Sequence, residues 1–259
     1  MSRAAILGAV VTVAAAAAAS LLLAGREEAP EGGAARLDFE TGDLSQYDMV
    51  QRAAADRLRV VTDPTRQGDY AARFEVRAGD TPASTTGTRA ELIAEYDGAR
   101  KPAAGEHRWY RWSTLFAGHY PLVDLWQTFV QWKNDGLGSP PLAMTVQGGQ
   151  LRFSGGEQNR FHIFWRGPIR RGRWHDFVAH VLWSPEPETG LVELWHNGRQ
   201  VVPPTHAATM YRTPAGQPSP NYLKIGLYRH PAIKRPQVLY HDDVVVAARR
   251  ERVVRDGSG

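Results

Sequence analysis

The sequence has 259 residues, with 31 lysines and arginines against 27 aspartates and glutamates, a formal net charge of +4, and no cysteine. The length supports one large β domain or two small ones with a substantial hydrophobic core, and the missing cysteines exclude disulfide bonds and a lipidated cysteine. The modest basic excess fits an anionic partner, for which nucleic acid, acidic polysaccharide and membrane surface are all open.

The amino-terminal segment has the pattern of an export signal. Arg3 precedes an apolar, alanine-rich run, Ala4–Leu23, and small residues follow it. The run is also long enough to anchor the chain in a membrane if it is not removed. We therefore expect residues 1–25 to be a bacterial-type signal peptide or an anchor, and the protein to be secreted or extracytoplasmic. Residues 26–36, rich in Glu, Gly, Pro and Ala, are expected to form a linker.

The remaining chain is expected to form one domain over 37–250, followed by a tail at 251–259. Helical periodicity is nearly absent, and short segments of alternating apolar and polar residues are separated by Gly, Pro, Asp and Asn. A dozen strands in one domain predict an all-β fold, a two-sheet antiparallel β-sandwich of the jelly-roll, concanavalin A-like type. The expected strands are Leu58–Val61, Ala71–Arg77, Thr88–Ala94, Trp109–Phe116, Leu125–Lys133, Leu142–Val146, Leu151–Ser154, Arg160–Trp165, Trp174–Trp183, Leu191–His196, Tyr222–Arg229 and Val238–Ala247.

Three of these strands place unusual polar residues on one face. Successive side chains of a strand point to opposite faces, so each of the three has an aliphatic or aromatic face and an opposite face rich in Arg, Gln, Lys or Tyr. For one strand alone, an ordinary half-buried strand with a solvated face explains the pattern. Across three strands, cations and amides next to aromatic rings fit an acidic sugar chain, whose carboxylates they bind and whose rings they stack on. The residues on these faces are Arg89 and Glu91, then Gln127, Phe129, Gln131 and Lys133, and finally Lys224 and Tyr228.

The same strands carry a family resemblance. RAEL at 89–92, QWK at 131–133 and YLKIGLYR at 222–229 resemble the signature strands of jelly-roll polysaccharide lyases, in the group that includes heparin lyase I-like and glucuronan lyase enzymes, with alginate lyases more distant. The resemblance covers nearly the whole chain after residue 37. It implies a concave sheet that holds a uronic-acid polymer and cleaves it by β-elimination.

β-Elimination sets chemical demands that these residues can meet. The substrate carboxylate must be neutralised or hydrogen-bonded before the neighbouring C5 proton can leave, and Arg89 and Gln131, with Lys133 or Lys224, can do this. A base must take the C5 proton and an acid must protonate the departing C4 oxygen. A tyrosine beside cations can do both, and we choose Tyr228, four residues after Lys224.

One position departs from the family pattern. Lyases of this type often have a histidine where this chain has Lys133. Either Lys133 acts as the base, with a pKa lowered by burial and neighbouring cations, or a histidine enters the cleft from elsewhere. His162 and His230 are the first candidates, with His107 and His119 less favoured. A changed or lost activity is the third possibility.

Further contacts to substrate are expected from Lys224, Gln127, Glu91, His162 and Arg229, with Glu91 as a salt-bridging orienter of Arg89 or Lys133. The tryptophans are expected in the core rather than as sugar platforms.

A calcium site is also predicted. First and last strands of sandwiches commonly lie side by side, so acids near both ends of the domain could share a structural Ca²⁺: Glu40, Asp43, Asp242 and Asp243. Turn capping by the same side chains is an equally weighted alternative. No organic cofactor is expected.

The favoured function is an exported lyase, expected to be a monomer, that acts on an acidic polysaccharide and not on nucleic acid. The main alternative is a non-catalytic carbohydrate-binding or adhesion domain on the same fold. A glycoside hydrolase ranks third, because it needs two carboxylates facing the sugar and the expected site strands are cationic.

Overall fold

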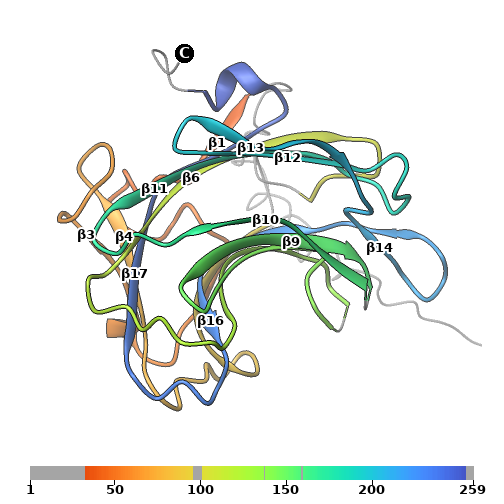
Figure 1. Ribbon diagram of the computed structural model, residues 1–259. Helices are drawn as coiled ribbons and strands as arrows, with labels where there is room; N and C mark the ends of the chain where they lie inside the picture. The colour runs from red at the N-terminus through yellow and green to blue at the C-terminus, as the bar shows by residue number, and fades with distance from the viewer. Residues whose placement is uncertain (1–32, 96–100, 137, 159, 255–259) are drawn as a thin grey trace, which may run out of the picture.

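The computed structural model describes residues 33–95, 101–136, 138–158 and 160–254. The predicted export signal at 1–25 lies outside the described residues. In the described part, no helix is long and apolar enough to cross a membrane. Two large antiparallel sheets lie one over the other, with β12 and β13 above β9 and β10 in Figure 1.

The first sheet, called here the β17 sheet, has eight strands. Its order is β13 (Arg199–His206), β12 (Leu191–His196), β11 (Trp174–Leu182), β6 (His107–Phe116), β17 (Gln237–Ala247), β4 (Ala71–Val76) and β3 (Leu58–Val61), and β1 (Ala34–Arg36) pairs with β17.

The second sheet, called here the β16 sheet, has seven strands. Its order is β10 (Arg160–Pro168), β9 (Gln150–Glu157), β8 (Leu142–Gln147), β7 (Gln127–Lys133), β16 (Tyr222–Arg229), β5 (Thr88–Ala94) and β2 (Met49–Gln51). The short strands β14 (Tyr211–Arg212) and β15 (Pro218–Ser219) pair with each other, and two 3₁₀ turns are η1 (Ala55–Arg57) and η3 (Arg250–Arg252).

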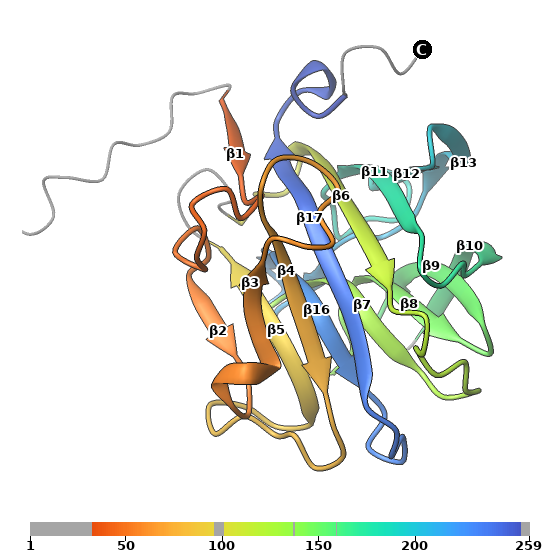
Figure 2. The ribbon, with the colours of Figure 1, turned by 90° about the vertical axis from the view of Figure 1, so that its left-hand side faces the viewer.

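The core lies between the two sheets. Figure 2 shows β17 and β4 in front of β16 and β5, the arrangement that packs the facing sides together. The alternate residues Ala90, Leu92 and Ala94 of β5 enter this core, while Arg89 and Glu91 are directed away from it. Burial of these apolar faces is the main force that holds the sandwich together.

The all-β, two-sheet jelly-roll prediction is confirmed, and strands β3, β5, β12 and β16 have the predicted bounds. Alternation identified them because one face of each is buried. Strands β1, β2, β14 and β15, each of two or three residues, are too short for alternation to be recognised. β1 occupies part of the predicted linker and lies beside β17, so the first and last strands are neighbours as expected.

Two irregularities interrupt the β16 sheet near its centre. The pairing of β7 with β8 shifts between Thr128 and Val130, and the pairing of β16 with β7 shifts between Ile225 and Tyr228. Gly226 lies within the second shift at φ +138°, where a Cβ would come 2.3 Å from the Ala90 carbonyl oxygen. Only glycine fits this position.

Candidate active site

Three neighbouring strands, β5, β16 and β7, supply the predicted site. Tyr228 is paired with Arg89, and Lys224 is paired with both Gln131 and Ile93. Directly opposed residues of antiparallel strands share a face. The outward face of the β16 sheet therefore brings together the polar side chains that the sequence pattern predicts to converge, Arg89, Glu91, Gln131, Lys133, Lys224 and Tyr228.

Glu91 is the centre of this group. It is only 2% exposed. Its Oε2 accepts from Arg89 Nη1 at 3.0 Å and lies 2.8 Å from Lys224 Nζ, and its Oε1 accepts from Gln131 Nε2 at 2.5 Å. Such a carboxylate fixes the positions of the two cations and the amide, so it orients Arg89 as expected, whereas Lys133 has other partners. We call Glu91, Arg89, Gln131 and Lys224 the Glu91 cluster.

The Glu91 cluster carries more positive than negative charge. One carboxylate faces two cations, and a second hydrogen bond from Lys224 goes to the neutral Gln51 Oε1 at 2.8 Å. Burial lowers the pKa of Lys224, with Glu91 opposing this shift and Arg89 adding to it. Arg89 Nε is buried and has no hydrogen-bond partner among the described residues. A buried unpaired donor is costly, so the cluster is suited to receive an anionic acceptor.

Tyr228 lies directly against the cluster. The Arg89 guanidinium carbon is 3.8 Å from the centre of the tyrosine ring, and the Trp126 ring meets it edge-on at 4.7 Å. Gly87 makes this position possible, since a Cβ there would come 2.8 Å from Tyr228 Cε2. Among the described residues, no hydrogen bond is made by the Tyr228 hydroxyl. The phenol is thus held by its ring and keeps its oxygen free for a ligand.

Lys133 is engaged differently. Its Nζ donates to the Asn134 carbonyl oxygen at 3.0 Å, to Asn134 Oδ1 at 2.9 Å, and to the Gly136 carbonyl oxygen. Burial lowers its pKa, as does the positive charge of Lys224. An ammonium has three hydrogens to donate, and here all three have acceptors. This arrangement makes Lys133 a clamp on the turn that follows β7 and leaves it poorly placed to accept a proton.

Two predicted substrate contacts lie in the interior instead. Gln127 and Arg229 are both 0% exposed. Gln127 Oε1 accepts from Gln237 of the opposite sheet, and Arg229 Nη1 donates to Gln237 Oε1 at 3.0 Å. The shift in β7 reverses the expected alternation, so Gln127 points between the sheets and Phe129 joins the core. Both residues are corrected from substrate contacts to buried links between the sheets.

The candidate histidines separate into near and far groups. His230, the second residue after Tyr228, lies 5.8 Å from Trp126 between ring centres, and its Nδ1 accepts the backbone N–H of Ala232. His162 is exposed on the edge strand β10, and β9, β8 and β7 separate it from β16. At about 4.8 Å per strand, β10 lies roughly 19 Å from β16 when measured along the sheet. His230 and Tyr228 both contact the Trp126 ring, which places His230 near the site.

The four acids proposed as calcium ligands have other partners. Glu40 accepts backbone N–H groups of residues 69 and 70, and Asp242 accepts those of residues 66 and 67. Asp43 caps its own turn by accepting from the serine two residues on, and Asp243 pairs with Arg111 at 2.7 Å. Within the described ranges, no group of three or more His, Cys, Asp or Glu side chains could hold a metal. The four acids do not form one ligand set, and the turn-capping alternative describes Asp43.

Three residues of this site were not expected from the sequence. Trp126, assigned to the core, is only partly buried and contacts Tyr228. Gln51 comes from β2, which is too short to be recognised, and binds Lys224. Gly87 leaves space for the tyrosine ring. No local pattern marks these residues, because each contacts a residue that is far away in the sequence.

The sequence and the fold are both similar to those of known proteins. A model of the polysaccharide lyase family matches residues 39–245. The chain is similar to the solved structure of an endo-β-1,4-glucuronan lyase from the fungus Trichoderma reesei, with a TM-score of 0.65, 18% identity, and coverage of 80% of this chain and 93% of that one.

Two other solved structures show the same architecture. An alginate lyase from Pseudomonas aeruginosa has a TM-score of 0.51 and 16% identity, with coverage of 76% of this chain and 87% of that one. A β-glucanase catalytic domain from Podospora anserina has a TM-score of 0.55 and 14% identity, with coverage of 79% and 85%. At such identities the likeness establishes the fold and leaves the chemistry to the site. No curated protein matches the sequence.

Proposed function

The chain belongs to the polysaccharide lyase family, and on that premise we propose that it cleaves a uronic-acid-containing, anionic polysaccharide, glucuronan-like or heparin-like, by β-elimination at the Glu91 cluster. The observation that carries this proposal is the surplus cation of the cluster beside a free phenol. Arg89 keeps a buried, unpaired Nε, and its guanidinium lies 3.8 Å from the ring centre of Tyr228.

The positive charge of the Glu91 cluster meets the first requirement of β-elimination, which is stabilisation of the substrate carboxylate. Abstraction of the C5 proton places negative charge on the adjacent carboxylate, which must be stabilised by groups already in position. Arg89 and Gln131 are fixed by Glu91 at 3.0 and 2.5 Å. We assign them to the substrate carboxylate, with Lys224 supplying positive charge behind them.

Tyr228 answers the second demand. In its phenolate form it takes the proton from C5, the C5 electron pair forms the C4–C5 double bond, and the C4–O bond breaks. The phenol then returns the same proton to the departing oxygen, so one residue serves as base and acid. His230, next to Trp126, is a second candidate for the base. Lys133 is assigned to the turn because its three donors are occupied.

Hydrolysis, the chemistry of the β-glucanase neighbour, fits this face poorly. Hydrolases of glycosides use two carboxylic groups on either side of the scissile bond. The cluster has one, Glu91, and both of its oxygens accept hydrogen bonds from buried donors. It has no means to act as a nucleophile or acid without the loss of those bonds.

We also propose that the protein is exported, on the pattern of residues 1–25, and that it meets its polymer outside the cytoplasm. Mass measurement of the protein recovered outside the cells would show whether that segment is removed.

The carboxylate assignment is tested by Arg89→Lys, which keeps the charge and removes the Nε donor and the planar fork. We expect cleavage of a polyuronate to fall by roughly 10-fold or more, since hydrogen bonds to charged groups contribute about 1.5–3 kcal/mol. Unchanged cleavage by Arg89→Lys would contradict the assignment. The domain would instead be a carbohydrate-binding module if the wild-type protein bound polyuronates and cut none.

A further inference from the structure

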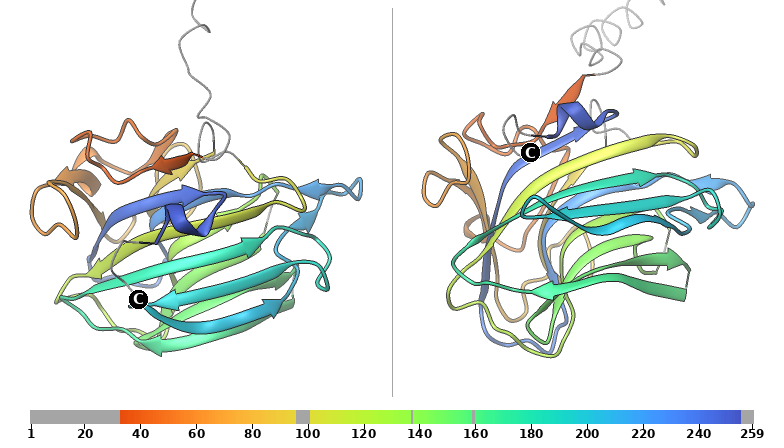
Figure 3. Two further views of the ribbon diagram at one scale, coloured as in Figure 1. Left: turned by 90° about the horizontal axis from the view of Figure 1, so that it is seen from above. Right: turned by 45° about the horizontal axis from the view of Figure 1, so that its top comes forward.

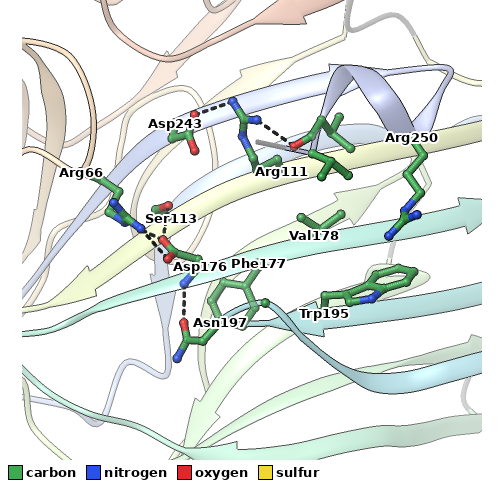
Figure 4. Close-up of a pocket in the computed structure, with 13 residues that line it drawn as sticks. Arg66, Arg111, Ser113, Asp176, Phe177, Val178, Trp195, Asn197, Asp243 and Arg250 are labelled. Atoms are coloured by element: carbon green, nitrogen blue, oxygen red, sulfur yellow. Dashed lines mark hydrogen bonds and ion pairs between the residues drawn. The ribbon is translucent and has the colours of Figure 1, made fainter. Parts of the chain in front are cut away.

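A separate pocket lies on the outward face of the other sheet. It has a volume of about 320 Å³ and is bounded by β6, β11, β12, β17 and the segment after β17 (Figure 4). Figure 3 shows that segment, with η3, lying over the face of the β17 sheet. Val253 anchors it by packing with Val245 and Ala247. The volume is at the small end of ligand sites, so it suits a single small ring rather than a length of polymer.

One end of the pocket is polar and firmly held. Arg66 binds Asp176 through two hydrogen bonds of 2.8 Å, and Ser113 Oγ donates to the same carboxylate at 2.7 Å. Asn197, at the hairpin turn with φ +50°, accepts the Asp176 backbone N–H at 2.9 Å. These groups converge at one side in Figure 4 and offer a fixed set of donors and acceptors for hydroxyl groups.

The other end carries an aromatic ring and a cation. Trp195 is partly buried, and the exposed Arg250 lies over it, with the guanidinium carbon 5.7 Å from the ring centre. This distance is near the limit of a cation–π contact, and Arg250 has no carboxylate partner in the described part of the chain. Its guanidinium can therefore turn to a ligand at little cost.

The rest of the pocket lining includes an apolar residue, Val178, and a third arginine, Arg111. Val178, between Arg111 and Trp195 in the sheet, gives an apolar floor. Arg111 Nη2 binds Asp243 and Nη1 binds the Val253 carbonyl oxygen, both at 2.7 Å, whereas its Nε is buried and has no partner in the described part of the chain. Three arginines against two aspartates leave the lining with one net positive charge.

We propose that this pocket is a second carbohydrate site and binds one uronic acid residue. The sugar ring packs on Trp195 and Val178, its carboxylate meets Arg250, and its hydroxyls reach the Asp176 end. A neutral sugar would not pair with the charge of Arg250, and a simple anion would not pack against the Trp195 ring. Because the pocket and the Glu91 cluster lie on opposite outward faces, the two sites bind independently, and the inference does not depend on catalysis.

The test uses sodium glucuronate, which has no glycosidic bond to eliminate, and calorimetric titration. We expect Arg250→Ala to weaken binding by roughly tenfold or more, because a charge-assisted contact is lost. Arg249→Ala is the matched control: it removes an adjacent exposed arginine that does not line the pocket. The methyl glycoside of glucose, which lacks the carboxylate, should bind at least tenfold more weakly than glucuronate.

The same titration with Arg89→Ala distinguishes binding at the pocket from binding at the Glu91 cluster. Binding that survives in Arg89→Ala and is lost in Arg250→Ala supports the second site. The inference is overturned if wild-type protein does not bind glucuronate, if Arg250→Ala binds as wild type does, or if Arg89→Ala alone removes the binding. Each of these results leaves the cleavage of polymers, measured in parallel, to decide the proposed function separately.

Discussion

The Glu91 cluster and the pocket on the β17 sheet pair their cations in different ways. In the pocket, the partly buried Arg66 and Arg111 each have their own aspartate, Asp176 and Asp243 respectively. On the β16 sheet Arg89 and Lys224 share one carboxylate, Glu91. One-to-one pairing leaves little field for a reaction, whereas a shared carboxylate leaves a positive charge where a substrate anion can use it. We infer from this difference that the Glu91 cluster serves the proposed reaction and that the pocket serves binding.

The largest effect is expected at Tyr228. Tyr228→Phe keeps the ring on Arg89 and removes only the hydroxyl, so elimination should fall by roughly 10²–10⁴-fold, the contribution of a positioned acid or base. Binding of the polymer should change little. Tyr222→Phe, on the same strand face, is the matched control and should stay within a few-fold of wild type in the same rate assay. Equal losses in both variants would remove the special role of Tyr228.

Glu91→Gln tests the shared carboxylate directly. It leaves two buried cations facing a neutral amide, and breaking a buried ion pair costs about 3–5 kcal/mol of unfolding free energy. Urea unfolding measures this loss. The control is Glu186→Gln, whose partner Arg212 and own side chain are both about half exposed, and surface pairs contribute at most about 1 kcal/mol. If Glu91 contributed no more than a surface ion pair, both variants would show a similar, small loss of unfolding free energy.

The stability of the protein should depend on pH through Asp242, a buried carboxyl group of the β17 sheet. Burial raises the pKa of Asp242 from 3.8 to about 6, against the lowering effect of three backbone N–H groups. The folded state therefore binds this proton more tightly than the unfolded chain does. Its contribution to stability is fully present below about pH 4 and is lost as the pH rises through 6.

Asp242→Asn should remove that dependence. The difference in unfolding free energy between the variant and wild type should change by up to about 2 kcal/mol between those two pH values, whatever constant offset the substitution adds. A difference that stays flat with pH would show that Asp242 is ionised in both states.

Part of the site could be predicted from the sequence alone. Alternation placed Arg89, Gln131, Lys224 and Tyr228 on one face, since each strand has a single buried side. The same rule misplaced Gln127, because one shift in pairing reverses every side chain beyond it. The position of Lys133 was predicted, but its occupation by three acceptors was not, because those acceptors belong to the turn that follows.

The smallest effect is expected from metal removal. Backbone N–H groups of residues 66–70 already occupy Glu40 and Asp242 and link both ends of the domain to one loop. We therefore expect excess chelator to leave the melting temperature unchanged. A clear drop in melting temperature that added Ca²⁺ reverses would restore the calcium site predicted from the sequence.

Analysis of the cleavage products distinguishes elimination of a polyuronate by the Glu91 cluster and Tyr228 from hydrolysis and from binding alone. Wild-type protein is incubated with glucuronan, a heparin-like polymer, alginate and a neutral β-glucan, and the ends are followed by ultraviolet absorbance and by mass. We expect an absorbing, unsaturated end on at least one polyuronate, lighter by one water than a hydrolysed end, and no cleavage of the neutral glucan. Saturated ends, or binding of every polyuronate without any cut, would contradict the proposed elimination.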